Sequence, residues 1–460
     1  MLRSRELSAV DLVNAVLGRI EEFGATLNCF ITVTAERARA EARAADDQLR
    51  KGSDLGPLHG IPISIKDNIA TAGVRTTAGS PIYANRVPAE DATVAARLFA
   101  KGAILIGKNN LYDFAYNAPN DYFGETRNPW ALQLCCGGSS SGSVSAVAAG
   151  LGYASIGNDG GGSTRAPASF SGVVGVKPTY GLVSRAGGTP TTASMSCVTP
   201  ITRSVTDAAI VLQAIAGPDA LDRTTARRQP TDLLRDLEHG IAGLRLGVPF
   251  RQSNEDVNQD VAAAFEKALA VLVGLGAELV DITLPHLNHT RAMLWTITGA
   301  EAAEFLEPLL RTNPDAFHPV TRGFLERARL LKAVDYVHAQ RLRQKLIVDM
   351  RRVMRDIDAL VTPSTPIVAY PVATRTLDIG GNAADVLTWY TRFLSIFNLT
   401  GQPAMSIPCG FDRAGLPIGL QVVGHAHGDA MMLRVARAYE RATDWHERHP
   451  PLRSNRPVVA

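Results

Sequence analysis

The spacing of apolar residues near the start of the chain predicts a helix. Apolar side chains recur there every three or four residues, the period of one helical face, at Val10, Val13, Val16, Leu17 and Ile20. Ser8 precedes this run with Asp11 three residues later, which resembles a capping box. An alanine-rich, charged stretch at about 34–50 predicts a second helix, so we expect the first fifty residues to be helical.

From about residue 55 onward, short apolar runs alternate with stretches of helical periodicity. The short runs predict strands, in the segments GIPISIKD, ILIGK, LRLGVPF, ELVDITL, DALVTPSTP and GLQVVG. Helical stretches are DATVAARLFAKGA, about 203–216, DVNQDVAAAFEKALAVLVGLG, a long region that ends near 357, and 429–442. This alternation is typical of an α/β protein.

We expect one large domain over residues 1–460, because no internal repeat, low-complexity tract or hinge-like stretch divides the chain. Its parts are N-terminal helices at about 1–50, a core at about 55–215, a more variable, largely helical region at about 250–357, and a return to the sheet at about 358–445.

Composition and charge exclude several classes of protein. A net charge of +3 is too weak to indicate nucleic acid or an anionic membrane as partner. The five cysteines form neither a C-x-x-C motif nor a Cys/His cluster, so we expect no disulfide framework and no metal site. With no run of 18 or more apolar residues, the sequence predicts a cytoplasmic protein.

The serine-rich stretch CCGGSSSGSV, at 135–144, raises the question of which hydroxyl reacts. Residues 138–142 match G-x-S-x-G, the nucleophile elbow of α/β-hydrolases, with Ser140 as nucleophile. His425 or His427 would then supply the base in the correct chain order. A flexible turn that opens a helix is the structural alternative.

Two other segments carry candidate chemistry. The three glycines of NDGGGSTR, at 158–165, leave consecutive N–H groups unshielded, which suits an oxyanion, although a structural turn explains them equally well. Lys66 ends an apolar run, and burial would lower its pKa and leave a neutral amine as general base. Pairing with Asp67 or another acid is the alternative for this lysine.

Together, these three segments resemble the amidase signature family, whose hallmark is a Ser–cis-Ser–Lys triad. The segments are LHGIPISIKD, GGSSSGS and NDGGGSTRAPASFSGVVGVKPTYGLVS, with 73 residues from Lys66 to Ser139 and 24 from Ser139 to Ser163. The likeness continues through GKNNLYDFAY, FGETRNPW, PITRSVTDAA, DALVTPSTP and GLPIGLQVVG, and thins between about 220 and 355. It implies a mixed, twisted central sheet flanked by helices.

The resemblance also implies roles for individual residues. Ser163 is the nucleophile, Ser139, after a cis peptide bond, is the proton relay, and Lys66 is the base. The N–H groups expected to hold the oxyanion are those of Gly160, Gly161, Gly162 and Ser163. Supporting residues are Ser140, Asp159 and Arg165. Tyr116 and Asn117 are the candidates for substrate binding, and the aromatic residues Trp389, Tyr390, Phe393 and Phe397 are expected mainly in the core.

The sequence departs from the family pattern in three places. Ser141 stands for a glycine, Asn158 and Gly160 alter the usual T-D-x-G-G-S, and Ser196 and Thr199 replace the Asp and Gly of S-L-D-x-x-G-P. The last change leaves the substrate open.

We therefore expect an amidohydrolase that cleaves a small amide, or a carbamate, with no metal and no cofactor. One alternative is the A subunit of a glutamine-dependent tRNA amidotransferase, although the altered loop favours a free-standing enzyme. The other is an inactive paralogue that acts as a binding module. The oligomeric state stays open, a homodimer included.

Overall fold

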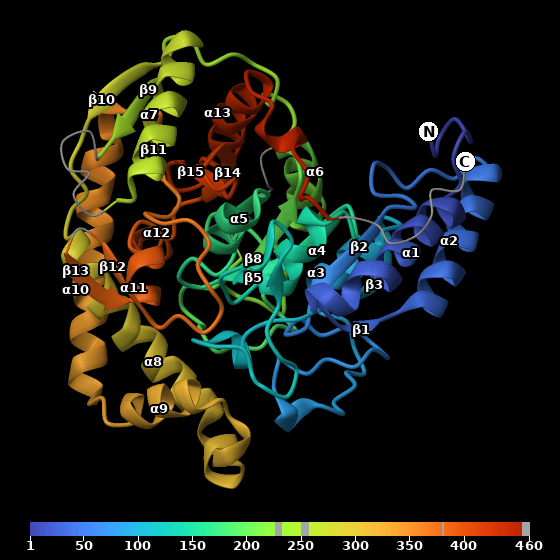
Figure 1. Cartoon of the computed structure of the whole chain (residues 1–460), viewed down its shortest axis with the longest axis horizontal. Helices are drawn as coiled ribbons and strands as arrows, with labels where there is room; N and C mark the ends of the chain where they lie inside the picture. The colour runs from blue at the N-terminus through green and yellow to red at the C-terminus, as the bar shows by residue number, and fades with distance from the viewer. Residues whose placement is uncertain (226–231, 250–256, 380, 453–460) are drawn as a thin grey trace.

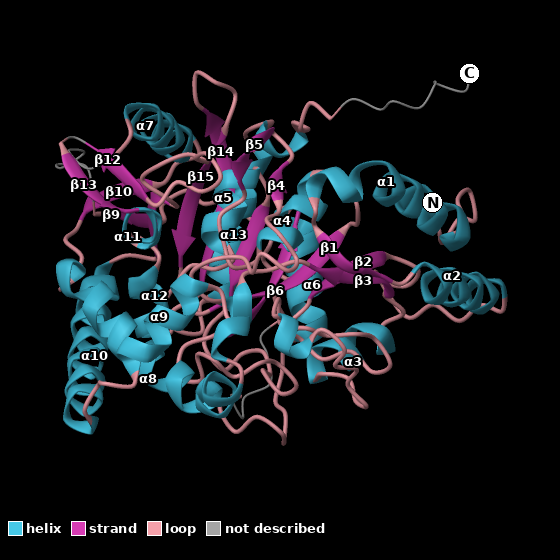
Figure 2. Cartoon of the chain, turned by 60° about the horizontal axis from the view of Figure 1, so that its bottom comes forward, coloured by secondary structure: helices cyan, strands magenta, loops and turns pink. Residues whose placement is uncertain are grey.

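A computed structural model describes residues 1–225, 232–249, 257–379 and 381–452. Residues 250–256, at the start of the region expected to be largely helical, lie outside the described residues. An 11-stranded sheet crosses the molecule in the order β1-β3-β2-β6-β8-β7-β14-β15-β11-β9-β10 (Figure 2). Its strands are β1 (Phe30–Val33), β2 (Pro62–Lys66), β3 (Ile104–Asn109), β6 (Ala154–Asp159), β7 (Val174–Lys177), β8 (Cys197–Thr202), β9 (Arg245–Val248), β10 (Glu278–Asp281), β11 (Ala359–Pro363), β14 (Ala404–Phe411) and β15 (Pro417–Val423).

The sheet is mixed. β2 pairs in parallel with both β3 and β6, whereas β6, β8, β7, β14, β15 and β11 follow one another antiparallel. Two hairpins lie outside it, β4 (Arg127–Asn128) with β5 (Ala131–Cys135) and β12 (Thr376–Ile379) with β13 (Asn382–Asp385). The expected α/β fold with a mixed central sheet is confirmed.

Helices cover the sheet and extend beyond both of its ends. Figure 1 shows α1 and α2 at one end of the molecule and α8, α9 and α10 at the other. The helices are α1 (Ala9–Leu27), α2 (Ala35–Arg50), α3 (Thr93–Ala100), α4 (Ser141–Ala148), α5 (Arg165–Ser171), α6 (Val205–Ile215), α7 (Gln259–Gly274), α8 (Leu287–Thr312), α9 (Pro319–Ala328), α10 (Ala333–Val353), α11 (Val386–Thr391), α12 (Ser395–Thr400) and α13 (Asp429–Arg441).

The N-terminal segment corrects one expectation. α1 begins after Ser8, whose Oγ accepts a hydrogen bond from the Asp11 N–H at 3.0 Å, as the capping pattern predicts. The first fifty residues are not all helical, because Phe30–Val33 forms β1 and pairs antiparallel with β3. This short run of β-branched and aromatic residues completes an edge of the sheet, a tertiary pairing that helical periodicity on either side does not reveal.

Two short helices in the middle of the molecule are fully buried, and the candidate serines lie in the segments just before them. Every residue of α4 and of α5 is buried. α4 fits because its side chains are small: a Cβ on Gly142 would come within 2.5 Å of the Asn110 and Cys29 carbonyl oxygens. The serine-rich stretch enters α4, and the triple-glycine loop joins β6 to α5.

A buried ion pair fixes that second loop. Asp159, at the end of β6, and Arg165, at the start of α5, are both 0% exposed, with 2.9 Å between Asp159 Oδ2 and Arg165 Nε. Arg165 also donates to Asp159 Oδ1, Asn398 Oδ1 in α12, Gln421 Oε1 in β15 and the Leu394 carbonyl. All five of its N–H donors are thus used. This ion pair therefore ties β6, α5, α12 and β15 together.

Replacing Asp159 with Asn should cost about 3–5 kcal/mol of unfolding free energy, because the Arg165 guanidinium would be left charged and buried without its carboxylate. Urea unfolding followed by circular dichroism measures this loss. A matched control is Arg441→Gln, which breaks the exposed pair with Glu238 and should cost less than about 1 kcal/mol. Equal, small losses in both variants would show that the buried pair does not hold the fold.

Candidate active site

Lys66 lies at the end of β2, fully buried, with three oxygen atoms around its Nζ. The distances are 2.7 Å to Ser139 Oγ, 2.9 Å to Ser140 Oγ and 2.6 Å to Asn158 Oδ1. Burial lowers the pKa of Lys66 well below its ordinary value, and the Asp159 carboxylate opposes this in part. The site therefore favours a neutral amine, the form that can accept a proton.

The alternative in which Lys66 pairs with Asp67 is wrong. Asp67 accepts hydrogen bonds from the N–H and the hydroxyl of Thr77, at 2.7 and 2.5 Å. Its charged neighbour is Lys108, with 3.7 Å from Asp67 Oδ1 to Lys108 Nζ.

The serine-rich stretch approaches the triple-glycine loop. The Gly138–Ser139 peptide bond is cis, as the resemblance implies. A Cβ on Gly138 would overlap the Tyr112 ring, so only glycine fits this close approach. The Ser140 N–H donates to the Ser163 carbonyl at 3.1 Å, which joins the two segments, and Ser139 and Ser163 line the same cavity.

The triple-glycine loop corrects the predicted oxyanion donors. The Gly162 N–H already donates to Asp159 Oδ1 at 2.7 Å, so it is not free for an oxyanion. Gly162 has a φ of 119°, which favours glycine, and a Cβ there would meet Leu394 at 2.7 Å. The N–H groups of Gly160, Gly161 and Ser163 have no acceptor among the residues that the structure describes. These three N–H groups are therefore free to donate to a ligand.

The nucleophile elbow centred on Ser140 is not supported. Ser140 Oγ donates to the Asn158 carbonyl at 3.2 Å and accepts from Lys66. His425 Nε2 instead contacts the Ile357 carbonyl at 2.7 Å, and the His427 N–H donates to Thr179 Oγ1. Neither histidine lines the cavity of Ser139 and Ser163.

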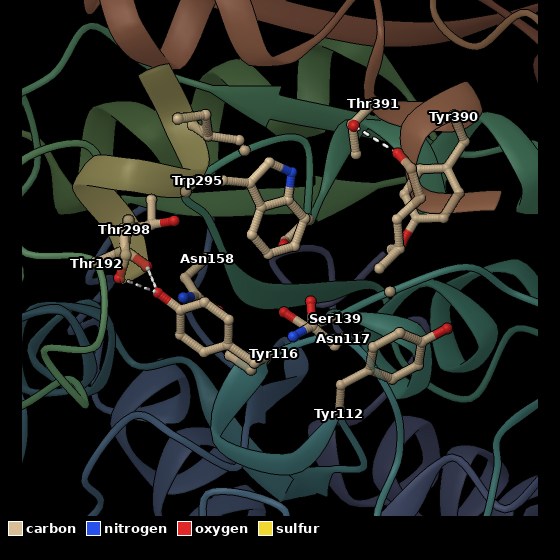
Figure 3. Close-up of a pocket in the computed structure, with 17 residues that line it drawn as sticks. Tyr112, Tyr116, Asn117, Ser139, Asn158, Thr192, Trp295, Thr298, Tyr390 and Thr391 are labelled. Carbon is tan, nitrogen blue, oxygen red and sulfur yellow. Dashed lines mark hydrogen bonds between the residues drawn. The ribbon is translucent and has the colours of Figure 1, made fainter. Parts of the chain in front are cut away.

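Aromatic side chains form much of the cavity wall. Tyr112, Tyr116, Trp295 and Tyr390 surround Ser139 and Asn158 in Figure 3. The cavity volume is about 80 Å³. Tyr390 contributes to the wall, whereas Phe393 and Phe397 belong to the core, as expected for most of that aromatic group.

Both predicted substrate-binding residues line the cavity. The Tyr116 hydroxyl is engaged by the protein, with 2.8 Å to the Thr191 carbonyl and 3.1 Å to the Thr298 carbonyl, so this residue offers its ring to a ligand. Asn117 also lines a second cavity.

Sequence reasoning missed several wall residues, namely Thr192, Leu294, Trp295, Thr298, Leu387 and Thr391. Three of these, Leu294, Trp295 and Thr298, lie in α8, within the segment where the family resemblance thins. No local motif distinguishes them from ordinary core or surface residues.

The departures from the family pattern have different places in the structure. Asn158 contacts Lys66 directly. Thr199, in β8, is buried, and its Oγ1 lies 2.7 Å from Thr164 Oγ1, so it belongs to the packing behind the loop. Ser196 lines a neighbouring cavity that shares Asn158 and Thr192 with the one described above.

In the part of the chain that the structure describes, no three His, Cys, Asp or Glu side chains gather in a group that could hold a metal ion. No described helix is both long and apolar enough to span a membrane.

Comparisons with known proteins identify the family of this chain. A family model described as Amidase matches residues 11–433. The A subunit of the glutamyl-tRNA(Gln) amidotransferase of Moorella thermoacetica is 39% identical, in an alignment that covers 98% of this chain and 97% of the relative.

Solved structures give the same result. An inhibitor-bound member of a vestigial complex, which reveals the origins of an s-triazine catabolic enzyme, superposes with a TM-score of 0.91 at 33% identity over 96% of both chains. Native peptide amidase from Stenotrophomonas maltophilia superposes with a TM-score of 0.87 at 31% identity over 98% of this chain and 96% of its own. The chain thus belongs to the amidase signature family of amidohydrolases.

Proposed function

We propose that this amidohydrolase cleaves the C–N bond of a small amide through an acyl-enzyme on Ser163, with Ser139 as proton relay and Lys66 as base. The observation that carries the proposal is the fully buried Lys66 amine, 2.7 Å from Ser139 Oγ, in a site where Ser139 and Ser163 line one cavity. A carbamate offers the same carbonyl geometry and falls within the proposal.

Each proton and bond in this reaction is accounted for. Ser163 Oγ bonds to the substrate carbonyl carbon while its proton passes to Ser139, and the proton of Ser139 passes to Lys66. The N–H groups of Gly160, Gly161 and Ser163 stabilise the oxyanion. The tetrahedral intermediate then collapses and its C–N bond breaks, while the proton held by Lys66 returns through Ser139 to the leaving amine. Water then attacks the acyl-enzyme with the same base, and Ser163 leaves as the hydroxyl.

Two adjoining cavities divide the site. The inner cavity of about 80 Å³ lies against Ser139 and Ser163 and would hold the reacting amide group. An outer cavity of about 450 Å³ shares Asn117, Trp295 and Leu387 with it and would take the rest of the substrate.

The outer cavity favours a substrate with a negative group remote from the amide. Its charged lining residues are Arg291, Arg327 and Asp385. Arg291 Nη2 lies 3.8 Å from Asp385 Oδ1, whereas Arg327 has no ion-pair partner among the described residues. One excess positive charge at the rim suits a carboxylate.

A second candidate is the A subunit of a glutamine-dependent tRNA amidotransferase. The curated relatives favour it, since one at 39% identity spans 98% of this chain. In that case the ammonia released at Ser163 would pass to a partner protein. An inactive binding module is disfavoured, because Lys66, Ser139 and Ser163 are all present.

The first test concerns the triad. A fluorophosphonate should label wild-type protein at Ser163, and Ser163→Ala should lose the label in mass spectrometry. Lys66→Ala should lower the labelling rate by about 10²–10⁴-fold, the usual contribution of a general base. Lys66→Arg should lower the labelling rate by a similar factor, since a guanidinium does not deprotonate. Labelling of Ser140, or near-normal labelling of a folded Lys66→Ala protein, would contradict the assignment.

The pH dependence follows from the direction of the Lys66 shift. Because burial lowers the pKa of Lys66, its amine loses its proton at a pH below the ordinary lysine pKa of about 10.4. The labelling rate should therefore rise with pH in that lower range, and this rise is the lysine limb of the pH profile. A rate that rises only near pH 10.4 would show that the base is an unshifted lysine.

The substrate prediction uses a panel of amides matched in length. The monoamides of dicarboxylic acids should have a higher kcat/KM than uncharged alkyl amides, and Arg327→Gln should reduce this preference about tenfold or more. Arg329→Gln is the control, because Arg329 pairs with Glu307 and does not line either cavity. Equal kcat/KM for charged and uncharged amides would contradict a carboxylate at this rim.

Glutamine separates the two candidate functions. A free-standing hydrolase should act on several amides as the isolated chain and purify without partner proteins. The amidotransferase component should prefer glutamine, with an activity that rises when its partner proteins and tRNA are added. Glutamine hydrolysis that depends on co-purified partners would therefore favour the second candidate.

A further inference from the structure

The environment of the Lys66 amine holds more acceptors than a relay to Ser139 requires. Its Nζ lies 2.7 Å from Ser139 Oγ, 2.9 Å from Ser140 Oγ and 2.6 Å from Asn158 Oδ1. A neutral amine has two N–H groups and one lone pair. Which oxygen faces the lone pair decides where the amine can accept a proton.

The hydrogen-bonding groups around the amine determine which oxygen faces its lone pair. The carboxamide oxygen of Asn158 carries no hydrogen, so it takes one N–H. Ser140 Oγ donates its own proton to the main-chain carbonyl of Asn158, at 3.2 Å, and therefore takes the second N–H. The lone pair is left for the hydroxyl of Ser139.

The carboxamide of Asn158 is itself held in place. Its Oδ1 also accepts from Asn68 Nδ2 at 3.3 Å. Since both neighbours of this atom are N–H donors, the oxygen rather than the nitrogen of the amide faces Lys66. Asn68 is itself buried.

Asn158 is one of the positions where this chain departs from the family pattern, which commonly has threonine there. A threonine hydroxyl can accept an N–H and can also donate to the lone pair of the amine. A carboxamide oxygen can only accept. The asparagine therefore removes one competing arrangement.

We infer that Asn158 is a positioning residue that aims the lone pair of Lys66 at Ser139, directly through its carboxamide and indirectly through the carbonyl that holds Ser140. This inference rests on the proposed function. When Lys66 accepts a proton, the new N–H points back to Ser139, and all three N–H groups of the ammonium then have acceptors. The same contacts thus serve the amine before and after proton transfer.

The charged groups around Lys66 come from neighbouring strands and from α5. Asp159 in β6 is paired with Arg165, and Asp67, next to Lys66, is paired with Lys108 in β3. The described polar contacts of Lys66 Nζ itself are all with uncharged groups. A charge introduced at Asn158 would therefore act on Lys66 without another charge in contact with Nζ.

The test compares Asn158→Asp and Asn158→Leu with wild type. The measured quantity is the pH profile of the inactivation rate by a fluorophosphonate. Asp places a carboxylate beside Nζ and stabilises the ammonium, so the rising limb should move up by about 1 pH unit or more. Leu removes the acceptor, so the limb should move down, while the plateau rate falls by on the order of 10²-fold because the lone pair is no longer aimed.

Asn288→Asp is the matched control, because Asn288 is exposed and lines a different cavity. Its limb should stay at the wild-type pH. If Asn158 had only a structural role, both variants would be inactivated more slowly, but the rising limb of their pH profiles would not move up in Asn158→Asp and down in Asn158→Leu. An Asn158→Asp limb that coincides with the Asn288→Asp limb, or a wild-type plateau and limb in Asn158→Leu, would overturn the inference. If Asn158→Leu fails to fold by circular dichroism, the Asp variant decides alone.

This outcome is distinct from failure of the proposed function. If wild-type protein is not labelled at Ser163, or has no lysine limb, the triad assignment fails. If wild type behaves as proposed and only the Asn158 variants do not shift, the positioning role alone fails.

Discussion

The buried pair of Asp159 and Arg165 is the interaction on which the site depends. It closes the turn from β6 into α5, and the Asp159 carboxylate also holds the N–H groups of Gly162 and Thr164. Because these N–H groups point inward to the carboxylate, the others in the loop are left for a ligand. The carboxylate of this ion pair thus determines which N–H groups of the loop stay free. Its charge also opposes, without cancelling, the effect of burial on Lys66.

The chemistry of Lys66 follows from its place in the sheet. β2 is an interior strand with β3 and β6 on either side, and its last side chain is buried among these elements. Lys108, in the neighbouring strand β3, shares the burial of Lys66 but has different contacts. Lys108 is also buried and its pKa is lowered to about 8, but it lies beside Asp67 and away from the serines. Burial makes a neutral lysine available, and the contacts decide what that lysine can do.

Much of the fold could be predicted from the sequence, because its signals are local. Apolar runs predict β2, β3, β9, β10, β11 and β15, and helical periodicity predicts α1, α3, α6, α7 and α13. β1 was missed because an edge strand of four residues depends on its partner β3. The residues proposed as the triad could be named because their motifs have characteristic spacing.

The rest of the site depends on tertiary structure. Gly162 looks like its neighbours in the sequence, and only the Asp159 contact distinguishes its N–H from theirs. Trp295 comes from a helix more than 130 residues after Ser163 along the chain, so no motif could link the two. Asn158 departs from the family pattern in the sequence, but its contact with Lys66 depends on the pairing of β6 with β2 in the sheet.

A crystal structure of the protein after reaction with a fluorophosphonate tests the proposed catalytic site most directly. We expect phosphorus bonded to Ser163 Oγ. We also expect a phosphoryl oxygen within hydrogen-bond distance of the Gly160 and Gly161 N–H groups, with the Gly162 N–H still donating to Asp159. Phosphorus on Ser139 or Ser140, or a Gly162 N–H turned from Asp159 to the phosphoryl oxygen, would contradict it.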